Sequence, residues 1–141
     1  MSKPIKYKLS VSNQLSELGN IHSTLEKLIN DWDIPLQFGM PLNLAIEEAF
    51  TNVVNYAYHD HEQRLIDIEF VRTENQIEII ITDNGFPYDP TQNADPRTDL
   101  PLEERPIGGL GIFLIKKLMD DVQYQRHSDK NILKLTKRIT Q

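Results

Sequence analysis

The chain has 141 residues, with 15 Lys plus Arg, 21 Asp plus Glu and no cysteine, so its formal net charge is −6. The lack of cysteine excludes disulfides, thiolate metal sites and cysteine nucleophiles, and the acidic surplus argues against direct nucleic-acid binding, which needs clustered Lys and Arg. We expect a single domain over residues 1–141. No apolar run approaches the roughly 20 residues of a membrane helix, and residues 1–6 lack the apolar stretch of a signal peptide. We therefore expect a cytoplasmic protein with no membrane partner.

The first third of the chain predicts one strand and two helices. A period of two over residues 5–11 is typical of a half-buried strand. Apolar residues then recur every three or four positions over residues 15–32, which predicts an amphipathic helix that ends before Pro35. Pro41 suits the first turn of a second helix, where its missing N–H is not needed. The apolar positions that follow extend this helix to about Tyr58.

The rest of the chain predicts two pairs of strands around an irregular segment. In chain order the elements are strands at 66–70 and 77–81 joined by a hairpin at 73–75, a helix at 111–119, and closing strands around 122–124 and 133–139. Residues 85–107 show neither the helical nor the strand periodicity of apolar residues. A segment of this length in a compact domain is usually a functional lid or a disordered insert.

The predicted order of elements is β-α-α-β-β-lid-α-β-β. Most of the strands are apolar on one face only, so a single mixed, largely antiparallel sheet should carry its helices on one side. The predicted fold class is therefore α+β, in the form of a two-layer α/β sandwich.

Glu48 and Asn52 form the first candidate constellation. They stand four residues apart on the second predicted helix and therefore share a face, which we expect to lie roughly opposite the apolar stripe. A carboxylate can accept a proton from a hydroxyl group, and an amide oxygen is a neutral ligand that suits Mg²⁺. A solvated helix face explains this pair when it is considered alone.

The second constellation is Asp83 and Gly85, at the end of an apolar strand. A carboxylate at a strand end can accept a hydrogen bond from the exocyclic amine of an adenine, and a glycine lets a base approach the backbone closely. An ordinary Asp-Asn-Gly turn is the alternative.

The third constellation is Gly108, Gly109 and Gly111, at the start of a predicted helix. Backbone N–H groups at a helix N-terminus, with no side chains in the way, can bind phosphate. The alternative is a glycine-rich hinge, and the segment matches neither of the common phosphate-loop motifs.

Other groups look like sites but have simpler explanations. Residues 59–62 (His-Asp-His-Glu) resemble metal ligands, and we interpret them as a polar loop after a helix. Residues 127–129 (His-Ser-Asp) contain the residue types of a hydrolase triad, but we expect a hairpin turn there. Trp32 and the leucine stripe of the first helix are interpreted as core or as a dimer face.

The three constellations match one family in order and spacing. Residues 48–52 (Glu-Ala-Phe-Thr-Asn), 83–90 (Asp-Asn-Gly-Phe-Pro-Tyr-Asp-Pro) and 108–115 (Gly-Gly-Leu-Gly-Ile-Phe-Leu-Ile) resemble the ATP-binding domain of the GHKL superfamily, which has the Bergerat α/β sandwich. Within it the chain looks most like the bacterial anti-sigma factor serine kinases, which are stand-alone domains of similar length. The resemblance covers nearly the whole chain.

The resemblance implies a role for each residue that matches the family motifs. Glu48 would be the general base, Asn52 the Mg²⁺ ligand, and Asp83 the partner of the adenine amine. The other nucleotide-binding positions that it implies are Gly85, Pro87, Gly108, Gly109, Leu110 and Gly111. Residues 86–107 would form the ATP lid.

The resemblance also implies an activity and partners. It describes an ATP- and Mg²⁺-dependent serine/threonine protein kinase that phosphorylates a STAS-domain antagonist and sequesters a sigma factor, and homodimerisation is implied by the resemblance alone. Leu110 stands where some members have a basic residue, so a nucleotide-binding module that switches partners without phosphotransfer remains an alternative. A structural interaction domain without nucleotide is another. Because a metal ion and backbone dipoles can hold phosphates without a basic patch, the net charge of −6 predicts strict Mg²⁺ dependence.

Overall fold

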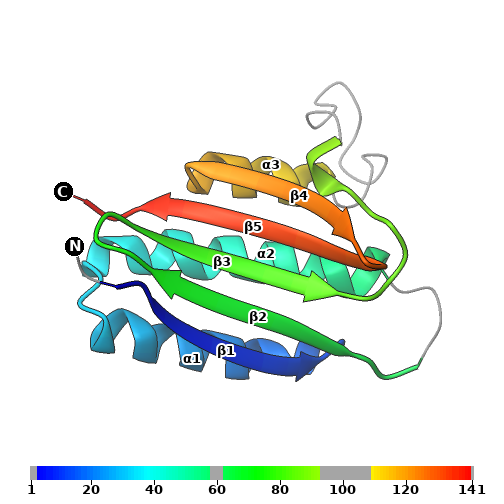
Figure 1. The fold of residues 1–141 in the computed structure, drawn as a ribbon, viewed down its shortest axis with the longest axis horizontal. Coiled ribbons are helices and arrows are strands. Elements are labelled where there is room, and N and C mark those ends of the chain that lie inside the picture. Colours follow the sequence, from blue (N-terminus) through cyan, green and yellow to red (C-terminus); the bar gives the residue numbers. More distant parts are fainter. Residues whose placement is uncertain (1–2, 58–61, 93–108, 141) are drawn as a thin grey trace.

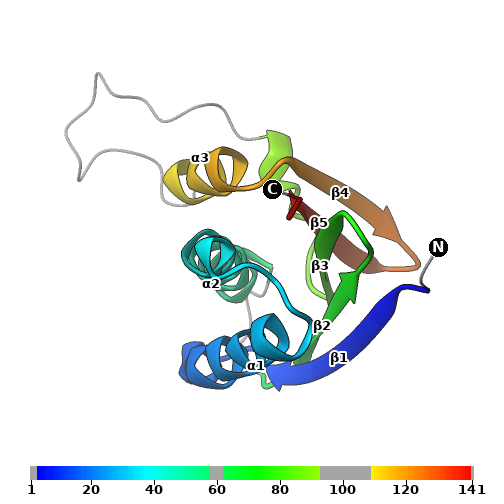
Figure 2. The ribbon, with the colours of Figure 1, turned by 90° about the vertical axis from the view of Figure 1, so that its left-hand side faces the viewer.

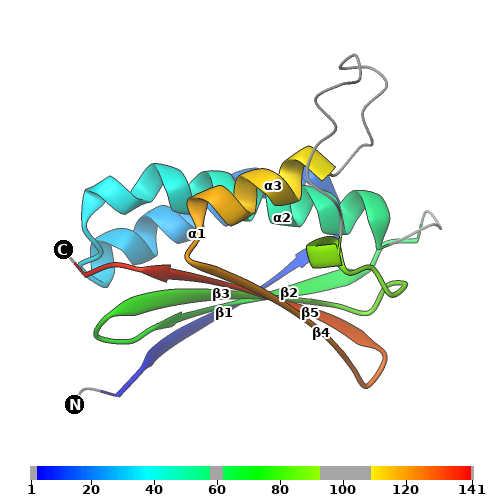
Figure 3. The ribbon, with the colours of Figure 1, turned by 90° about the horizontal axis from the view of Figure 1, so that it is seen from above.

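The computed structural model describes residues 3–57, 62–92 and 109–140. These residues form two layers, with a sheet on one side and the α-helices on the other (Figures 1 and 3). The elements are β1 (Ile5–Ser12), α1 (Leu18–Asp31), α2 (Gly39–Tyr56), β2 (Leu65–Arg72), β3 (Gln76–Asp83), α3 (Gly109–Leu118), β4 (Asp121–His127) and β5 (Lys130–Arg138). Short 3₁₀ turns occupy Leu15–Glu17, Leu36–Phe38 and Pro90–Gln92. The predicted α+β sandwich and its order of elements are confirmed.

The strands are arranged in the order β1-β2-β3-β5-β4, and each of the four ladders in the described part of the chain is antiparallel. The expectation of a mixed sheet is therefore wrong in this detail. β4 takes the outer position and turns back through a hairpin, so β5 enters between β3 and β4 and runs opposite to both.

Two element boundaries differ from the sequence prediction. The third helix begins at Gly109 rather than at Gly111, and α2 ends at Tyr56, while Tyr58 lies outside the described residues. Of the predicted lid, residues 86–92 are described, and 93–107 lie outside the described part.

The core lies between the sheet and the helices, with α2 at its centre. The inward apolar residues of β2 and β3 are fully buried isoleucines and one phenylalanine: Ile66, Ile68, Phe70, Ile77, Ile79 and Ile81. Figure 2 shows α2 between α1 and α3, so this helix is covered by the sheet and flanked on both sides. Its buried stripe is correspondingly wide, and it contains one polar residue, Asn52.

The turn between β4 and β5 confirms the hairpin predicted for residues 127–129. Ser128 and Asp129 have φ angles of 52° and 63°, which is the left-handed pair that a two-residue hairpin requires. Residues 59–61 of the other His/Asp group lie outside the described residues. Among the residues that are described, no three His, Asp or Glu side chains gather into a metal site, and no helix is long and apolar enough to cross a membrane.

Candidate functional site

Buried polar side chains mark one end of the sandwich. Asn52, Asp83 and Asn131 are 6%, 3% and 3% exposed, and all three line the same small hollow. Polar residues are buried this deeply only where hydrogen bonds or a ligand compensate for the lost water, so their gathering is more informative than any apolar patch.

The secondary structure explains why these three residues meet. Asp83 is the last residue of β3, and it continues the inward face of Ile79 and Ile81 by the period of two. Asn131 lies directly opposite Asp83 in the β3–β5 ladder. The C-terminal half of α2, the end of β3 and the start of β5 lie at the same end of the molecule in Figure 1, where Asn52 completes the group.

Asn131 holds the centre of a hydrogen-bond network. Its Nδ2 donates to Asp83 Oδ1 at 2.9 Å and to the Phe86 carbonyl oxygen at 2.7 Å. Its Oδ1 accepts from the Tyr124 hydroxyl and from Arg126 Nη1, the latter at 3.1 Å, with the Tyr88 N–H at 3.4 Å. Asn131 was not among the candidate residues predicted from the sequence. Its position as a polar residue on the inward face of a strand otherwise lined by leucines could have indicated its role.

The Asp83 carboxyl group is held on one side only. Its Oδ1 also accepts the Gly85 N–H at 2.8 Å, while Oδ2 accepts no hydrogen bond from the described residues. Burial raises the pKa of Asp83, and the bonds from Asn131 and Gly85 together with the charge of Arg126 oppose that rise. The site therefore presents a buried carboxylate with one oxygen available to a ligand.

The Glu48–Asn52 pair lies differently from the sequence prediction. The two residues do share one side of α2, one turn apart, but Asn52 lies on the buried side beside Ala49 and Val53 rather than opposite the apolar stripe. The strand ends and the segment after Gly85 cover this part of α2, because Asn52 lines the small hollow together with Asp83, Asn131, Tyr88 and Pro90. Asn52 Nδ2 is buried without a hydrogen-bond partner in the described structure. Glu48 is half-buried one turn earlier.

Gly85 is required by packing against the end of α2. A Cβ at this position would overlap the Ala57 carbonyl oxygen and lie 2.8 Å from the carbonyl carbon. The next residue, Phe86, donates its N–H to that same oxygen at 2.7 Å, which satisfies a carbonyl at the helix C-terminus. This close approach explains the glycine without reference to a bound base.

The hollow is nearly filled by the segment that follows Gly85. Tyr88 and Pro90 line it, and the Tyr88 ring stacks on the Tyr56 ring with centroids 5.3 Å apart. The remaining volume is about 10 Å³, which is room for about one water molecule. A planar ligand larger than water can enter only if Tyr88 and Pro90 move.

The glycine segment enters the same region from α3. The first turn of α3 is Gly109, Leu110 and Gly111, and α3 packs beside α2. Its first N–H groups have no partner within the helix, as at any helix start. Gly108 lies outside the described residues, and Pro87 is exposed. Basic residues stand near the glycine segment in the sequence. Lys116 Nζ donates to the Thr91 carbonyl oxygen at 3.4 Å, while Arg97 and Arg105 lie outside the described part.

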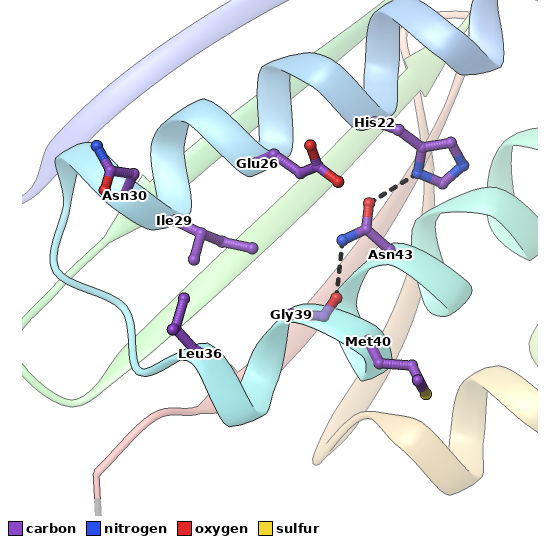
Figure 4. A pocket seen from close by; sticks show the side chains of 8 residues that line it. All are labelled: His22, Glu26, Ile29, Asn30, Leu36, Gly39, Met40 and Asn43. Carbon is purple, nitrogen blue, oxygen red and sulfur yellow. Dashed lines mark hydrogen bonds between the residues drawn. The ribbon is translucent and has the colours of Figure 1, made fainter.

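A second, larger hollow of about 580 Å³ lies between α1 and the start of α2 (Figure 4). There His22 Nδ1 lies 2.7 Å from Asn43 Oδ1, and Asn43 Nδ2 donates to the Gly39 carbonyl oxygen. The exposed side chains of Leu36 and Met40 stand at its rim. None of the site residues predicted from the sequence lines this hollow, so it is distinct from the candidate site.

Comparison with known proteins identifies the class of domain to which this two-layer sandwich belongs. Residues 11–137 match the family described as histidine kinase-like ATPase domain. The chain belongs to this family, and within it to the group that contains the RsbW and BtrW serine kinases.

Two relatives support that placement, and a solved structure supports the fold. Serine-protein kinase RsbW of Oceanobacillus iheyensis is 38% identical over 110 residues, covering 75% of this chain and 70% of that protein. Serine/threonine-protein kinase BtrW of Bordetella bronchiseptica is 33% identical over 105 residues, covering 74% and 72%. The crystal structure of the RsbU and RsbW domains of Rv1364c from Mycobacterium tuberculosis matches 99% of this chain and 33% of that chain, with a TM-score of 0.70 and 11% identity. That last likeness concerns the fold.

Proposed function

We propose that this protein binds Mg·ATP at the hollow between α2, β3 and β5 and transfers the terminal phosphoryl group to a serine or threonine of a partner protein. The observation that carries the proposal is the buried Asp83–Asn131 pair, which leaves one carboxylate oxygen available beside Asn52. Membership of a family of ATPase domains whose relatives are named serine kinases supports the same activity.

The residues present fit a purine nucleotide. Asp83, which is 3% exposed, offers Oδ2 as an acceptor, and an exocyclic amine is the complementary donor. The backbone N–H groups of the first turn of α3 and the polarity of that helix end favour phosphate without a basic side chain. Gly108 and Leu110 would contribute to the same phosphate cradle.

The residues also fit a magnesium ion that arrives with the nucleotide. The Asn52 amide is buried and lacks a partner at Nδ2, and the nitrogen and oxygen of an amide can exchange places by a flip. One neutral amide oxygen does not hold Mg²⁺ alone, but Mg²⁺ commonly keeps several waters and binds substrate phosphates. When bound, the ion would neutralise charge that develops on the phosphates.

In this mechanism the chain itself supplies orientation and a base. Asp83 holds the base of the nucleotide, and the first turn of α3 steadies the phosphates. Glu48 accepts the proton of the attacking hydroxyl group from its position one turn before Asn52. The closing of residues 86–107 over the nucleotide would exclude water and so favour transfer to protein over hydrolysis.

The proposed partners are a STAS-domain antagonist as substrate and a sigma factor as the sequestered protein, with action in the cytoplasm and as a homodimer. Their support is the group to which the chain belongs. The test incubates the protein with Mg²⁺ and γ-labelled ATP beside the STAS-domain proteins of the same genome. Labelled serine or threonine on one of them is the expected result, and its dependence on Mg²⁺ should be strict.

A partner switch without phosphotransfer is the second candidate function, because Leu110 stands where some members of the family have a basic residue. In that case Mg·ADP would bind saturably in a calorimetric titration, while every STAS-domain protein stayed unlabelled. The absence of saturable Mg·ADP binding would contradict both functions.

Asp83→Asn separates the binding role of this residue from its effect on stability. The Asn Oδ1 can still accept the bonds from Gly85 and Asn131, but an NH₂ group replaces the free oxygen and opposes the purine amine. We expect Mg·ADP affinity to fall about a hundredfold, measured by calorimetry. Asp121→Asn, which changes an exposed carboxyl group at the start of β4, should leave the affinity unchanged. Equal affinity of Asp83→Asn and the unaltered protein would contradict the role of Asp83.

The same variant should be more stable than the parent without nucleotide. Burial raises the pKa of Asp83 in the folded state, so the folded protein binds this proton more tightly than the unfolded chain. That contribution to stability is present below the unfolded pKa and is lost as pH rises through the folded pKa. At neutral pH Asp83→Asn should therefore melt higher than the parent, with a difference that shrinks toward acidic pH.

A further inference from the structure

Asn131 has an amide whose orientation the surrounding donors determine. Arg126 Nη1 and the Tyr88 backbone nitrogen can only donate, and both face the same end of the amide, at 3.1 and 3.4 Å. That end must therefore be the oxygen, and the NH₂ group must face Asp83. The hydrogen-bond network therefore excludes the flipped orientation of the Asn131 amide.

This fixed amide decides which carboxylate oxygen of Asp83 is engaged. Nδ2 donates to Oδ1 at 2.9 Å, and the Gly85 N–H donates to the same oxygen at 2.8 Å. The two donors occupy Oδ1 and prevent the carboxyl group from turning. The other oxygen, Asp83 Oδ2, has no donor among the described residues. It is therefore the oxygen that a ligand in the hollow can reach.

We propose that Asn131 is a positioning residue that sets the base specificity of this site, so that the site takes 6-aminopurine nucleotides and rejects 6-oxopurine nucleotides. The inference rests on the proposed nucleotide binding. A 6-amino group donates to the free oxygen, whereas a 6-oxo group places an acceptor against a carboxylate. Without the Asn131 amide, Asp83 can rotate and accept water or a different donor, so this discrimination weakens.

The position of Asn131 makes the constraint rigid. It faces Asp83 across the β3–β5 ladder, and the Tyr124 hydroxyl and Arg126 hold its oxygen from the neighbouring strand β4. Nδ2 also donates to the Phe86 carbonyl oxygen at 2.7 Å, which links the Asp83 carboxyl group to the segment that covers the hollow. Residues of β3, β4 and β5 and of that segment therefore all form hydrogen bonds with the Asn131 side chain or hold it in place.

The first measurement uses the unaltered protein and two probes, Mg·ADP and Mg·IDP, in calorimetric titrations. IDP differs from ADP in having a 6-oxo group in place of the amine. We expect ADP to bind at least about tenfold more tightly, as expected for one hydrogen bond to a charged group. Equal affinities would overturn the inference and leave nucleotide binding in place. Failure to bind either probe would remove the proposed function and this inference together.

The second measurement asks whether Asn131 is responsible. Asn131→Leu should lower the ADP-to-IDP preference about tenfold, mainly through weaker ADP binding, while Asn131→Thr, which keeps a hydroxyl donor, should stay within about threefold of the parent. Gln125→Leu, an amide-to-leucine change at an exposed position of β4, should keep the full preference. A melting curve accompanies each variant, and Asn131→Ala, which also lacks a donor, replaces the leucine variant if that one does not fold. A folded Asn131→Leu or Asn131→Ala variant that keeps the parent preference would overturn the inference.

Discussion

Glu48→Gln is expected to lower phosphotransfer about a thousandfold, while the affinity for Mg·ADP stays within about twofold of the parent. A positioned general base contributes about 10²–10⁴ to a rate, and glutamine keeps the shape of glutamate without its basicity. The Glu48 side chain makes no hydrogen bond or ion pair with the described residues, so the fold should not change. The measurement is a single-turnover rate with labelled ATP beside a calorimetric titration.

Glu47→Gln is the matched control for this prediction. Glu47 is the neighbouring residue on α2, and its Oε1 lies 3.8 Å from His22 Nε2 with the carboxyl side chain 41% exposed. Loss of so exposed a pair has little effect on stability, and phosphotransfer should stay within about twofold of the parent. If both variants lost activity equally, or if Glu48→Gln lost nucleotide affinity as well, Glu48 would not act as the base.

Gly85→Ala is expected to destabilise the fold by about 3 kcal/mol, a large value for one methyl group. The added Cβ would overlap backbone atoms of Ala57, and backbone cannot turn aside as the end of a flexible side chain can. The shift would also break the bond from the Phe86 N–H to the Ala57 carbonyl oxygen. Thermal unfolding should show the melting temperature about 10 °C lower.

Gly19→Ala is the matched control, and we expect it to raise the stability of the fold rather than lower it. Gly19 lies in α1, and a Cβ there would meet no atom within 4 Å. Alanine loses less backbone freedom than glycine on folding, so this variant should gain a few tenths to about 1 kcal/mol. If Gly85→Ala kept parental stability and lost only nucleotide binding, space for the base rather than contact with Ala57 would explain this glycine.

Local sequence patterns were sufficient for the architecture of the sheet and helices. The alternation of Ile77, Ile79 and Ile81 predicted β3 and its inward face, and the helical spacing after Pro41 predicted α2. Both patterns depend on side chains close together in the chain, so neither needed knowledge of distant residues. The mixed sheet was wrong because strand direction depends on the whole path of the chain through β4 and β5.

The candidate site was only partly accessible from the sequence. Asp83 and the glycines were predicted from their local motifs, and Glu48 and Asn52 from their helical spacing. Asn131 was missed because its importance comes from a partner 48 positions away in the chain, brought opposite it by the β3–β5 ladder. The burial of Asn52 was mispredicted because strand ends and a loop segment that are distant in the sequence cover that part of α2.

The sequence by itself therefore determined the order of elements, the apolar faces and the family, since all three are written in short-range patterns. Only the tertiary structure decided which polar groups are buried together, which oxygen of Asp83 remains available, and why residue 85 is glycine. The physical reason is that desolvation, hydrogen-bond orientation and steric overlap depend on atoms that are neighbours in space and distant along the chain.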